Sequence, residues 1–568
     1  MKQQLDAARH LLDTENASDE HLLAGIALLS KIQPPPSQED MFSVLRPHLR
    51  FFARLISTHN NRIQKNDKSC HGYLSLALNV LRYTLSGEGL RHQQIVDEVC
   101  HMTPLLVEAT WLSCRDGRGG KVDDNSDHAN NLIELLKKFL ANSATDVLRL
   151  QKSGLLLHPP PEESHSRNYF FSAPMLQLME LACAAPFIDS LLQNTLRCTI
   201  STLNYVVDSA QSHGTGSLRG SSNEWKHVQS LISSSCKFSS YGSGKEFELE
   251  RGLALHLIAS LLQLRGIEFF TDVTWSKNAI IWLQVASGEL TILLGRVLTL
   301  VETNTDSDNE DSLDKKKLVQ WICDCERIFL SSLQYLAEVA TAIEDDATIT
   351  VDWDNLLRIR SSLESGMNSV FQFLTQSAPN QSQHDGSEDI YLEQDVAVSC
   401  IRCVGAWFSE TYDFQEACPN NDLNQEKLSL DAAQCSLIFC KRQHILDSSK
   451  SMREFNFDSQ ALLTSLLPGI VAIIRYHPPS VVCEVRRKRN KTLTTCIAGM
   501  YDILFDFIIE MLDEYECKRR DLQGTIMFQW LEILIDECGN DFCIECRCNR
   551  CSKYALRQVP KIQNSISS

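Results

Sequence analysis

Apolar residues recur at three- and four-residue intervals along almost the whole chain. This spacing places their side chains on one face of a helix, where a partner surface has to cover them. Alternating apolar and polar runs bounded by hairpin turns are nearly absent, so the chain is predicted to be all-α. Clear stripes are Leu22, Ile26 and Leu29; Leu132, Leu136 and Phe139; Leu253, Leu257, Leu261 and Leu264; and Val398, Ile401, Val404 and Phe408.

Several of the predicted helices are apolar on more than one side. The segment from Tyr73 to Leu85 is an example, with Leu74, Leu76, Leu78 and Val80 spread around the helix. Helices of this kind are covered by neighbours before and after them, as in an α-solenoid. We therefore predict an armadillo- or HEAT-like superhelix of antiparallel helix pairs. No strict repeat of the TPR or ankyrin kind is present, and degenerate units of about 40–47 residues are expected.

Polar connectors separate the predicted helices, and their loops would project from the edge of a solenoid without disturbing its core. The domain prediction has three parts: a helical repeat domain over residues 1–512, a terminal helix over 513–536, and a flexible, Cys-rich tail over 537–568. The main connectors are residues 116–127, 159–161, 208–224, 302–314 and 376–389.

Composition and charge narrow the range of partners. The 568 residues are 43% hydrophobic, which is enough for a large core, and the formal net charge is −18. An acidic surface repels phosphate backbones, so neither nucleic acid nor anionic membrane is an expected partner. The chain opens on a polar segment, which predicts no secretory signal. The 21 cysteines are then expected to be buried thiols in a reducing compartment, and the predicted location is cytoplasmic.

The best candidate for a membrane span runs from Asn278 to Val301. Glu289 and Arg296 interrupt it. An ionised side chain at the centre of a bilayer costs about 2.5–3.5 kcal/mol on insertion scales. A buried helix explains the segment better, and no transmembrane segment is predicted.

One motif is similar to a phosphate-binding loop but lacks residues that such a loop needs to bind phosphate and metal. Gly242 to Lys245 has the sequence GSGK, but Ser239 stands where the first glycine is required. Glu246 replaces the hydroxyl that would bind the metal, and a carboxylate there would repel phosphate.

An acidic motif is similarly incomplete as a calcium loop. Asp306, Asp308 and Glu310 have the right spacing, but Asp311 occupies the turn-glycine position and Lys317 stands where a glutamate should close the shell. No GxSxG, HExxH or GxGxxG motif is present. The sequence therefore predicts no enzyme, no catalytic residue, no cofactor site and no resident metal.

Two groups of cysteines have spacings that deserve comparison with metal and redox motifs. Cys400 and Cys403 form a CxxC inside a helical stripe, without the strand-to-helix context of a redox motif, so core packing is expected. Near the C-terminus, two CxxC pairs have the spacing of zinc knuckles but are separated by one residue only. Zinc binding and a disordered tail both remain open for this cluster, which comprises Cys538, Cys543, Cys546, Cys548 and Cys551.

A basic run, Arg486 to Lys491, stands out in an acidic chain. It is either a nuclear-import signal, a patch for an acidic partner, or a solvated loop after Pro478 and Pro479. The solvated loop is the favoured reading, because short charge runs are commonly just surface.

Four collinear segments resemble the neurochondrin family. Residues 19–32 (DEHLLAGIALLSKI) resemble its first helix, and residues 402–410 (RCVGAWFSE) resemble its R-x-x-G-A-W-x-x-E helix. Residues 463–469 (LTSLLPG) are similar to its L-L-P-G turn, and residues 255–266 to its middle. The similarity spans most of the chain from Asp19 to about Leu512.

The resemblance implies an armadillo-like cytoplasmic protein without catalysis, associated with neurite outgrowth and with binding receptor tails and signalling proteins. Gly405 and Ala406 would permit close helix contact, Trp407 would fill the core between repeats, and residues 467–469 would break one helix and start the next. Some members attach to membranes through N-terminal palmitoylated cysteines. The first cysteine here is Cys70, which does not support that anchor.

The sequence thus predicts a non-enzymatic scaffold whose partners are other proteins. A general adaptor in transport or ribonucleoprotein assembly is an alternative that rests on fold analogy. A zinc-dependent helical enzyme is the rival from another class, and metal analysis would separate it from the other two.

Overall fold

The computed structural model is almost wholly helical in the residues that it describes. These are residues 2–13, 18–33, 35–65, 71–84, 100–116, 126–143, 147–156, 171–184, 189–213, 222–238, 248–266, 268–271, 276–303, 311–344, 352–380, 388–411, 423–449, 459–476, 500 and 503–504. Within them one isolated β-bridge joins Leu156 to Phe171. The all-α prediction is confirmed.

The chain divides into two compact units, Met1–Arg265 and Gly266–Ser568. The boundary between the two units follows Arg265 and so lies within residues 1–512, which the sequence predicted to be one helical repeat domain. The helices of the first unit are α1 (Lys2–Leu12), α2 (Asp19–Ser30), α3 (Gln38–Leu45), α4 (Leu49–Gln64), α5 (His71–Thr84), α7 (Thr103–Asp116), α8 (Ser126–Ser143), α9 (Val147–Lys152), α10 (Ala173–Ala184), α11 (Asp189–His213), α12 (Ser222–Phe238) and α13 (Glu248–Arg265), with 3-10 turns at Arg46–His48 and Cys100–Met102.

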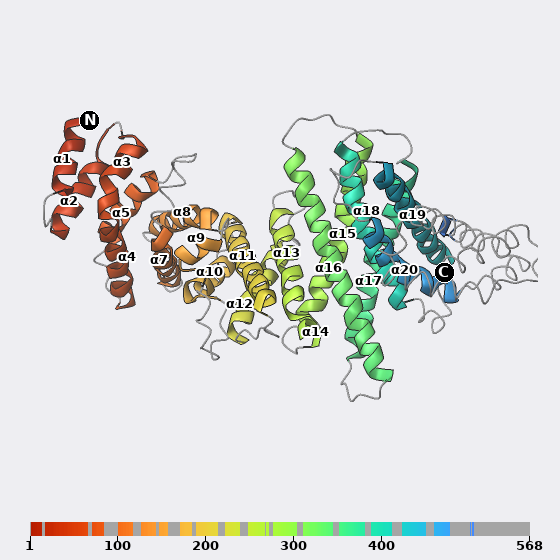
Figure 1. Ribbon diagram of the computed structural model, residues 1–568. Helices are drawn as coiled ribbons and strands as arrows, with labels where there is room; N and C mark the ends of the chain where they lie inside the picture. Colours follow the sequence, from red (N-terminus) through yellow and green to blue (C-terminus); the bar gives the residue numbers. More distant parts are fainter. Residues whose placement is uncertain are drawn as a thin grey trace, which may run out of the picture. The chain divides into compact units, whose positions relative to one another are not determined.

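Two layers of stacked helices build the first unit. One layer runs α2, α5, α8, α11 and α13, and the other runs α4, α7, α10 and α12, each helix packing on the next of its own layer. Pairs such as α7 with α8 and α12 with α13 join the layers (Figure 1). A core forms between the layers, because the inner helices are covered by a helix of the other layer and by the helices before and after them.

The second unit repeats this plan with longer helices. It contains α14 (Glu268–Thr271), α15 (Ser276–Thr303), α16 (Asp311–Glu344), α17 (Trp353–Asn380), α18 (Glu388–Thr411), α19 (Leu423–Ser449) and α20 (Ser459–Tyr476). One layer is α15, α17 and α19, and the other is α16, α18 and α20 (Figure 1). Each unit is therefore an α-solenoid of stacked helix pairs, as predicted.

The expected repeat length is correct only near the N-terminus. The Asn60 amide of α4 bonds the Leu105 carbonyl of α7, 45 residues further on. In later layers the corresponding separation is 56 residues between Asn204 and Ser260, and 78 between Thr291 and Ser369. The prediction of 40–47 residues is wrong there. In the second unit, α15 and α16 have 28 and 34 residues and so lengthen the repeat.

Serine and aspartate side chains fix where several helices begin. Ser18 Oγ accepts from the His21 N–H at the start of α2, and Ser37 Oγ accepts from the Asp40 N–H at the start of α3. These bonds satisfy backbone donors that have no partner within the helix.

Helices α18 and α20 cross at two glycines. A Cβ at Gly405 would overlap the carbonyl oxygen of Ser465, and one at Gly469 would lie 2.6 Å from the carbonyl oxygen of Gly405. The backbones therefore touch here, which only glycine permits. The expected role of Gly405 in close helix contact is confirmed.

The expectation that residues 467–469 separate two helices is wrong, because α20 runs unbroken from Ser459 to Tyr476 with Pro468 inside it. A proline removes one helical hydrogen bond. Buried residues before and after it, including Leu466 and Ile470, hold the helix against its neighbours. Tertiary packing thus outweighs the local helix-breaking signal.

The expectation that Trp407 fills the core is also wrong. Trp407 is half-buried, whereas the next residue, Phe408, is fully buried and stacks on Phe371 with ring centroids 6.0 Å apart. One residue is a turn of about 100° around a helix, so adjacent positions face different surroundings.

Helix α15 contains the stretch that matches a membrane span by length and composition. This stretch, Ser276–Leu300, has a mean hydropathy of 1.3, and half of its most apolar window is buried. The helix packs on α14, α16 and α17. The helix is therefore covered on the sides that face these neighbours, while other positions on it, such as Ile281 and Ile292, are exposed.

Several sequence predictions lie outside the described residues. These are the phosphate-loop segment 242–245, the acidic residues 306–310, the basic run 486–491, the predicted terminal helix 513–536 and the Cys-rich tail 537–568.

Candidate functional site

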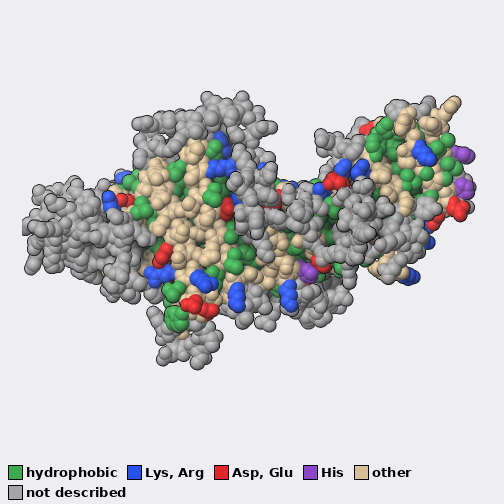
Figure 2. Space-filling view, turned by 180° about the vertical axis from the view of Figure 1, so that it is seen from behind, with side chains coloured by type: hydrophobic (Ala, Val, Ile, Leu, Met, Phe, Trp, Pro, Cys, Tyr) green, Lys and Arg blue, Asp and Glu red, His purple; other side chains and the backbone are tan. Residues whose placement is uncertain are grey.

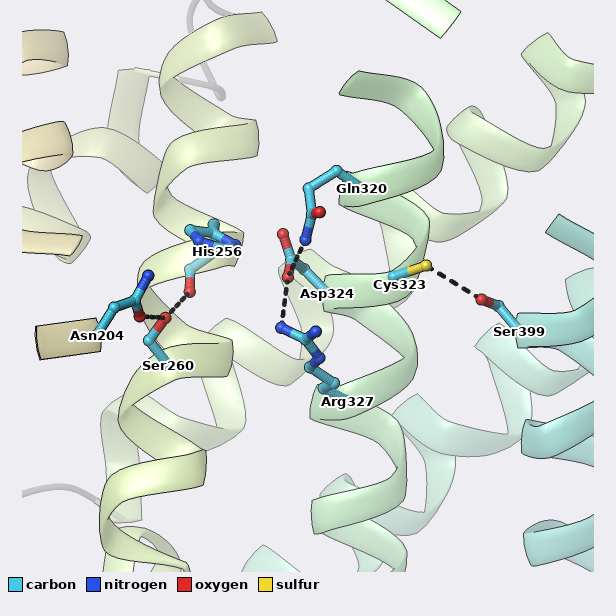
Figure 3. Close-up of polar contacts among 8 residues, drawn as sticks. All are labelled: Asn204, His256, Ser260, Gln320, Cys323, Asp324, Arg327 and Ser399. Atoms are coloured by element: carbon cyan, nitrogen blue, oxygen red, sulfur yellow. Dashed lines mark hydrogen bonds and ion pairs between the residues drawn. The ribbon is translucent and has the colours of Figure 1, made fainter. Parts of the chain in front are cut away.

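A buried carboxylate lies on α16, which is the kind of group from which an active site could be built. Asp324 is fully buried, and its Oδ1 accepts from Gln320 Nε2 at 3.1 Å and lies 3.4 Å from Arg327 Nη1 (Figure 3). Gln320 and Arg327 are one helical turn before and after Asp324 on the same helix. The carboxylate is therefore buried and bonded to side chains of its own helix, which favours a structural role.

A second acid joins α16 to α18. Glu326 is buried, and its Oε1 lies 3.7 Å from Arg402 Nη1. Burial raises the pKa of Glu326, while a hydrogen bond from Ser399 and the charge of Arg402 lower it. Ser399 Oγ also lies 3.2 Å from Cys323 Sγ (Figure 3). The group thus ties the two stacked helices together.

The thiols near this acid are not activated. Cys325, Cys400 and Cys403 are buried, and burial raises the pKa of each well above its usual value, with a smaller upward contribution from neighbouring acidic groups such as Glu326 for Cys400 and Cys403. A nucleophilic or metal-binding cysteine needs the thiolate, which these surroundings disfavour. Cys400 and Cys403 both pack in the core, which confirms the role predicted for them.

No group of three or more His, Cys, Asp or Glu side chains in the described parts of the chain is placed to hold a metal ion. The C-terminal cysteines proposed as alternative zinc ligands lie beyond these parts. The sequence named no catalytic residue, and the contacts of Asp324 and Glu326 do not supply one.

Polar ties also connect stacked helices in the first unit. Ser260 of α13 donates to the Asn204 side chain of α11 at 3.2 Å and to the carbonyl of His256 at 2.9 Å (Figure 3). Asn194 of α11 donates to the Lys137 carbonyl of α8. Sequence reasoning missed these amides because a single Asn carries no periodic signal. They fix the stacking of helices rather than form a catalytic site.

Large apolar side chains that reach solvent are concentrated on two helices. Of the five exposed large hydrophobic residues in the described structure, four lie on α15 and α17. Ile281 and Ile292 of α15 are 53% and 60% exposed, and Trp353 and Leu357 of α17 are both 62% exposed. The fifth is Leu148 of α9. We call the four residues of α15 and α17 the apolar surface.

The two helices of the apolar surface are parallel and in register. Thr291 Oγ1 lies 2.7 Å from Ser369 Oγ, and a Cβ at Gly366 would lie 3.2 Å from Ser287 Oγ. Both pairs are offset by nearly the same number of residues, so the beginnings of α15 and α17 lie at one edge of their layer. Ile281 and Leu357 are accordingly near the same end of this layer.

Most other apolar surface is dispersed. Figure 2 shows hydrophobic side chains reaching one face of the molecule at many separate places among neutral and charged groups. Isolated exposed apolar residues are normal, whereas their concentration on neighbouring helices is a feature of interaction sites.

No family model and no curated protein matches the chain. Among solved structures it is similar to a "circular tandem repeat protein with novel repeat topology and enhanced subunit contact surfaces", with 14% sequence identity and a TM-score of 0.22. The alignment covers 92% of this chain and 100% of that one. A likeness at this TM-score adds nothing to the fold assignment, which rests on the packing of the helices.

Proposed function

We propose that the protein is a non-enzymatic scaffold that binds other proteins through the surfaces of its stacked helices. The apolar surface on α15 and α17 is the observation that carries this proposal. Exposed Trp and aliphatic side chains lose water when a partner covers them, and such residues supply much of the binding energy of interfaces.

The internal polar groups support the same function. Asp324 is bonded within α16, Glu326 lies beside Ser399 and Arg402, and the buried thiols are protonated. Groups used in this way rigidify the stack and so hold its surface in a fixed shape for recognition.

In its finer form, the proposal is a cytoplasmic scaffold of the neurochondrin type whose partners are signalling proteins or receptor tails. Its support is the collinear set of motifs that includes residues 19–32 and 402–410. Gly405, within the second motif, makes the backbone contact that such a motif would require.

Affinity purification with mass spectrometry tests the proposal. The full chain is compared with a variant carrying Ile281→Ser, Ile292→Ser, Trp353→Ser and Leu357→Ser. These side chains are exposed, so the helical signal in circular dichroism should be unchanged, while partners that use the surface should be lost.

The matched control is Leu148→Ser, which changes the remaining exposed large residue, 63% exposed on α9. It should retain the partners. The proposal fails if no protein is captured specifically, or if the four-residue variant and the parent capture the same set.

A further inference from the structure

Helix α4 and the turn before it form a basic segment in an acidic protein. Between Arg46 and Lys65 the sequence holds five Arg and Lys residues and no Asp or Glu, while the whole chain has a formal net charge of −18. All five cationic side chains are exposed. They are Arg46, Arg50, Arg54, Arg62 and Lys65.

The helical spacing gathers most of these cations on one face. Arg50 and Arg54 are four residues apart, and Lys65 lies 15 residues beyond Arg50, which is close to four full turns. Exposed Thr58 and Asn61 lie between them and can donate hydrogen bonds. We call this strip the basic face of α4.

The opposite side of α4 is fixed in the core. Phe51, Phe52 and Ile56 are buried there. Asn60 is also buried, and its amide donates to the Leu105 carbonyl and to Glu108 of α7. The basic face is therefore presented by a helix whose rotation is set by its packing.

Acidic groups from neighbouring helices reach this face at its margins. Asp19 of α2 lies 2.9 Å from Arg54 Nη2, and the Arg54 guanidinium also lies over the Phe51 ring. At the other end, Glu108 of α7 accepts from the amides of Asn60 and Gln64. Asp13, directly after α1, lies 3.6 Å from His48. Of the three cations on the face, only Arg54 has an acidic partner among the described residues, so Arg50 and Lys65 leave the face positive.

We propose that the basic face of α4 binds an acidic peptide segment of a partner protein. From Arg50 to Lys65 the face is about 22 Å long, which an extended chain of about seven residues spans. Each arginine guanidinium can donate two hydrogen bonds to one carboxylate, and the neighbouring hydroxyl and amide groups can donate to further carboxylates along such a segment.

Two features favour a peptide over other anions. None of the exposed large hydrophobic residues lies on α4, so this face has no apolar group to insert into a bilayer. The net charge of the chain opposes a long polyanion such as nucleic acid, whereas a short peptide meets only the local charge, because salt screens charges beyond about 10 Å.

The inference deepens the proposed scaffold function and rests on it, and a fluorescence anisotropy titration tests it. The full chain is added to a fluorescein-labelled deca-glutamate peptide at about 50 mM salt, and again at about 200 mM. The parent is compared with the variant Arg50→Gln, Arg54→Gln, Lys65→Gln. The control variant is Lys226→Gln, Lys316→Gln, Arg358→Gln, which removes equal charge from exposed positions on α12, α16 and α17.

The parent should bind the peptide, and more weakly at the higher salt concentration. The α4 variant should bind about tenfold more weakly, as expected for the loss of three exposed charge pairs, while the control stays within about twofold of the parent. Circular dichroism should be the same for all three proteins. Loss of the peptide in both variants, or no binding by the parent, would overturn the proposal.

Labelled oligothymidylate and vesicles containing phosphatidylserine are titrated in parallel. If either binds in an α4-dependent way and the peptide does not, the face recognises phosphate polymers or lipid and the proposal is wrong. Capture of partners through the apolar surface is measured on the α4 variant as well. Its persistence would show that the scaffold function stands even where the acidic-peptide proposal fails.

Discussion

Phe408 of α18 is the residue whose truncation should cost most at the contact with α17. Its ring is fully buried and stacks on Phe371, so Phe408→Ala removes a large apolar group and leaves a cavity. We expect the free energy of unfolding to fall by about 3–5 kcal/mol. Trp407→Ala should cost clearly less, because Trp407 is half-buried. Urea unfolding of the full chain measures both, and an equal loss for the two would place Trp407 in the core after all.

Buried thiols predict a second effect at the scale of single residues. Burial raises the pKa of Cys198 and of Cys440 to about 12, whereas a thiol in the unfolded chain titrates near 8.5. The folded state therefore binds more protons in this range. The stability contributed by the protonated thiols is complete below about pH 8.5 and is lost as the pH rises toward about 12.

Chemical unfolding at a series of alkaline pH values measures this loss. The double variant Cys198→Ala, Cys440→Ala should lose less stability between pH 9 and pH 11 than the parent does, whatever its stability at neutral pH. Identical slopes for the two proteins would mean that the thiolates form without a folding cost.

At the scale of helices, the crossing of α18 and α20 depends on the absence of a side chain. Gly405→Ala would place a methyl group against the Ser465 carbonyl and 3.0 Å from Leu466 Cα, both of which are backbone atoms. Neither can rotate away, so the helices must separate. We expect a loss of about 1–3 kcal/mol in the free energy of unfolding, as for other cases of overpacking.

Gly288→Ala on α15 is the matched control for this substitution. It lies inside a helix, and a Cβ there would meet no atom within 4 Å. Alanine should stabilise the helix by about 0.5–1 kcal/mol, because glycine loses more backbone entropy on folding. If both substitutions destabilise equally, the effect belongs to helical glycines in general and not to the crossing.

At the scale of the whole molecule, each unit has its own pair of layers. The helices from α2 to α13 pack on one another within Met1–Arg265, which is one compact unit. A fragment of residues 1–265 should therefore show strong helical circular dichroism and a cooperative thermal transition. A fragment without such a transition would show that the first unit needs the rest of the chain in order to fold.

The sequence by itself determined the fold class and most of the core. The stripes at Leu253 to Leu264 and at Val398 to Phe408 predicted helices, and their apolar positions are buried apart from Leu253 and Leu264, which are half-buried. Apolar periodicity works here because a helix in a solenoid must bury its stripe against the next layer, whichever helix supplies the cover. The close contact at Gly405 was likewise predictable, since glycine within an apolar helix is typical of tight packing.

Only the tertiary structure decided which helices pack against each helix, and therefore which of its residues are buried. Pro468 remains inside α20 because packing on both sides outweighs one lost hydrogen bond, and Phe408 rather than Trp407 reaches the core because the rotation of α18 is set by its neighbours. The candidate surfaces were equally hidden. Exposure of Ile292 or Leu357 depends on which side of its helix the neighbouring helices leave uncovered. The basic face of α4 could be recognised only once the structure showed that Phe51 and Ile56 are buried. The sequence of a helix specifies its apolar periodicity, but it does not specify which side the neighbouring helices leave uncovered.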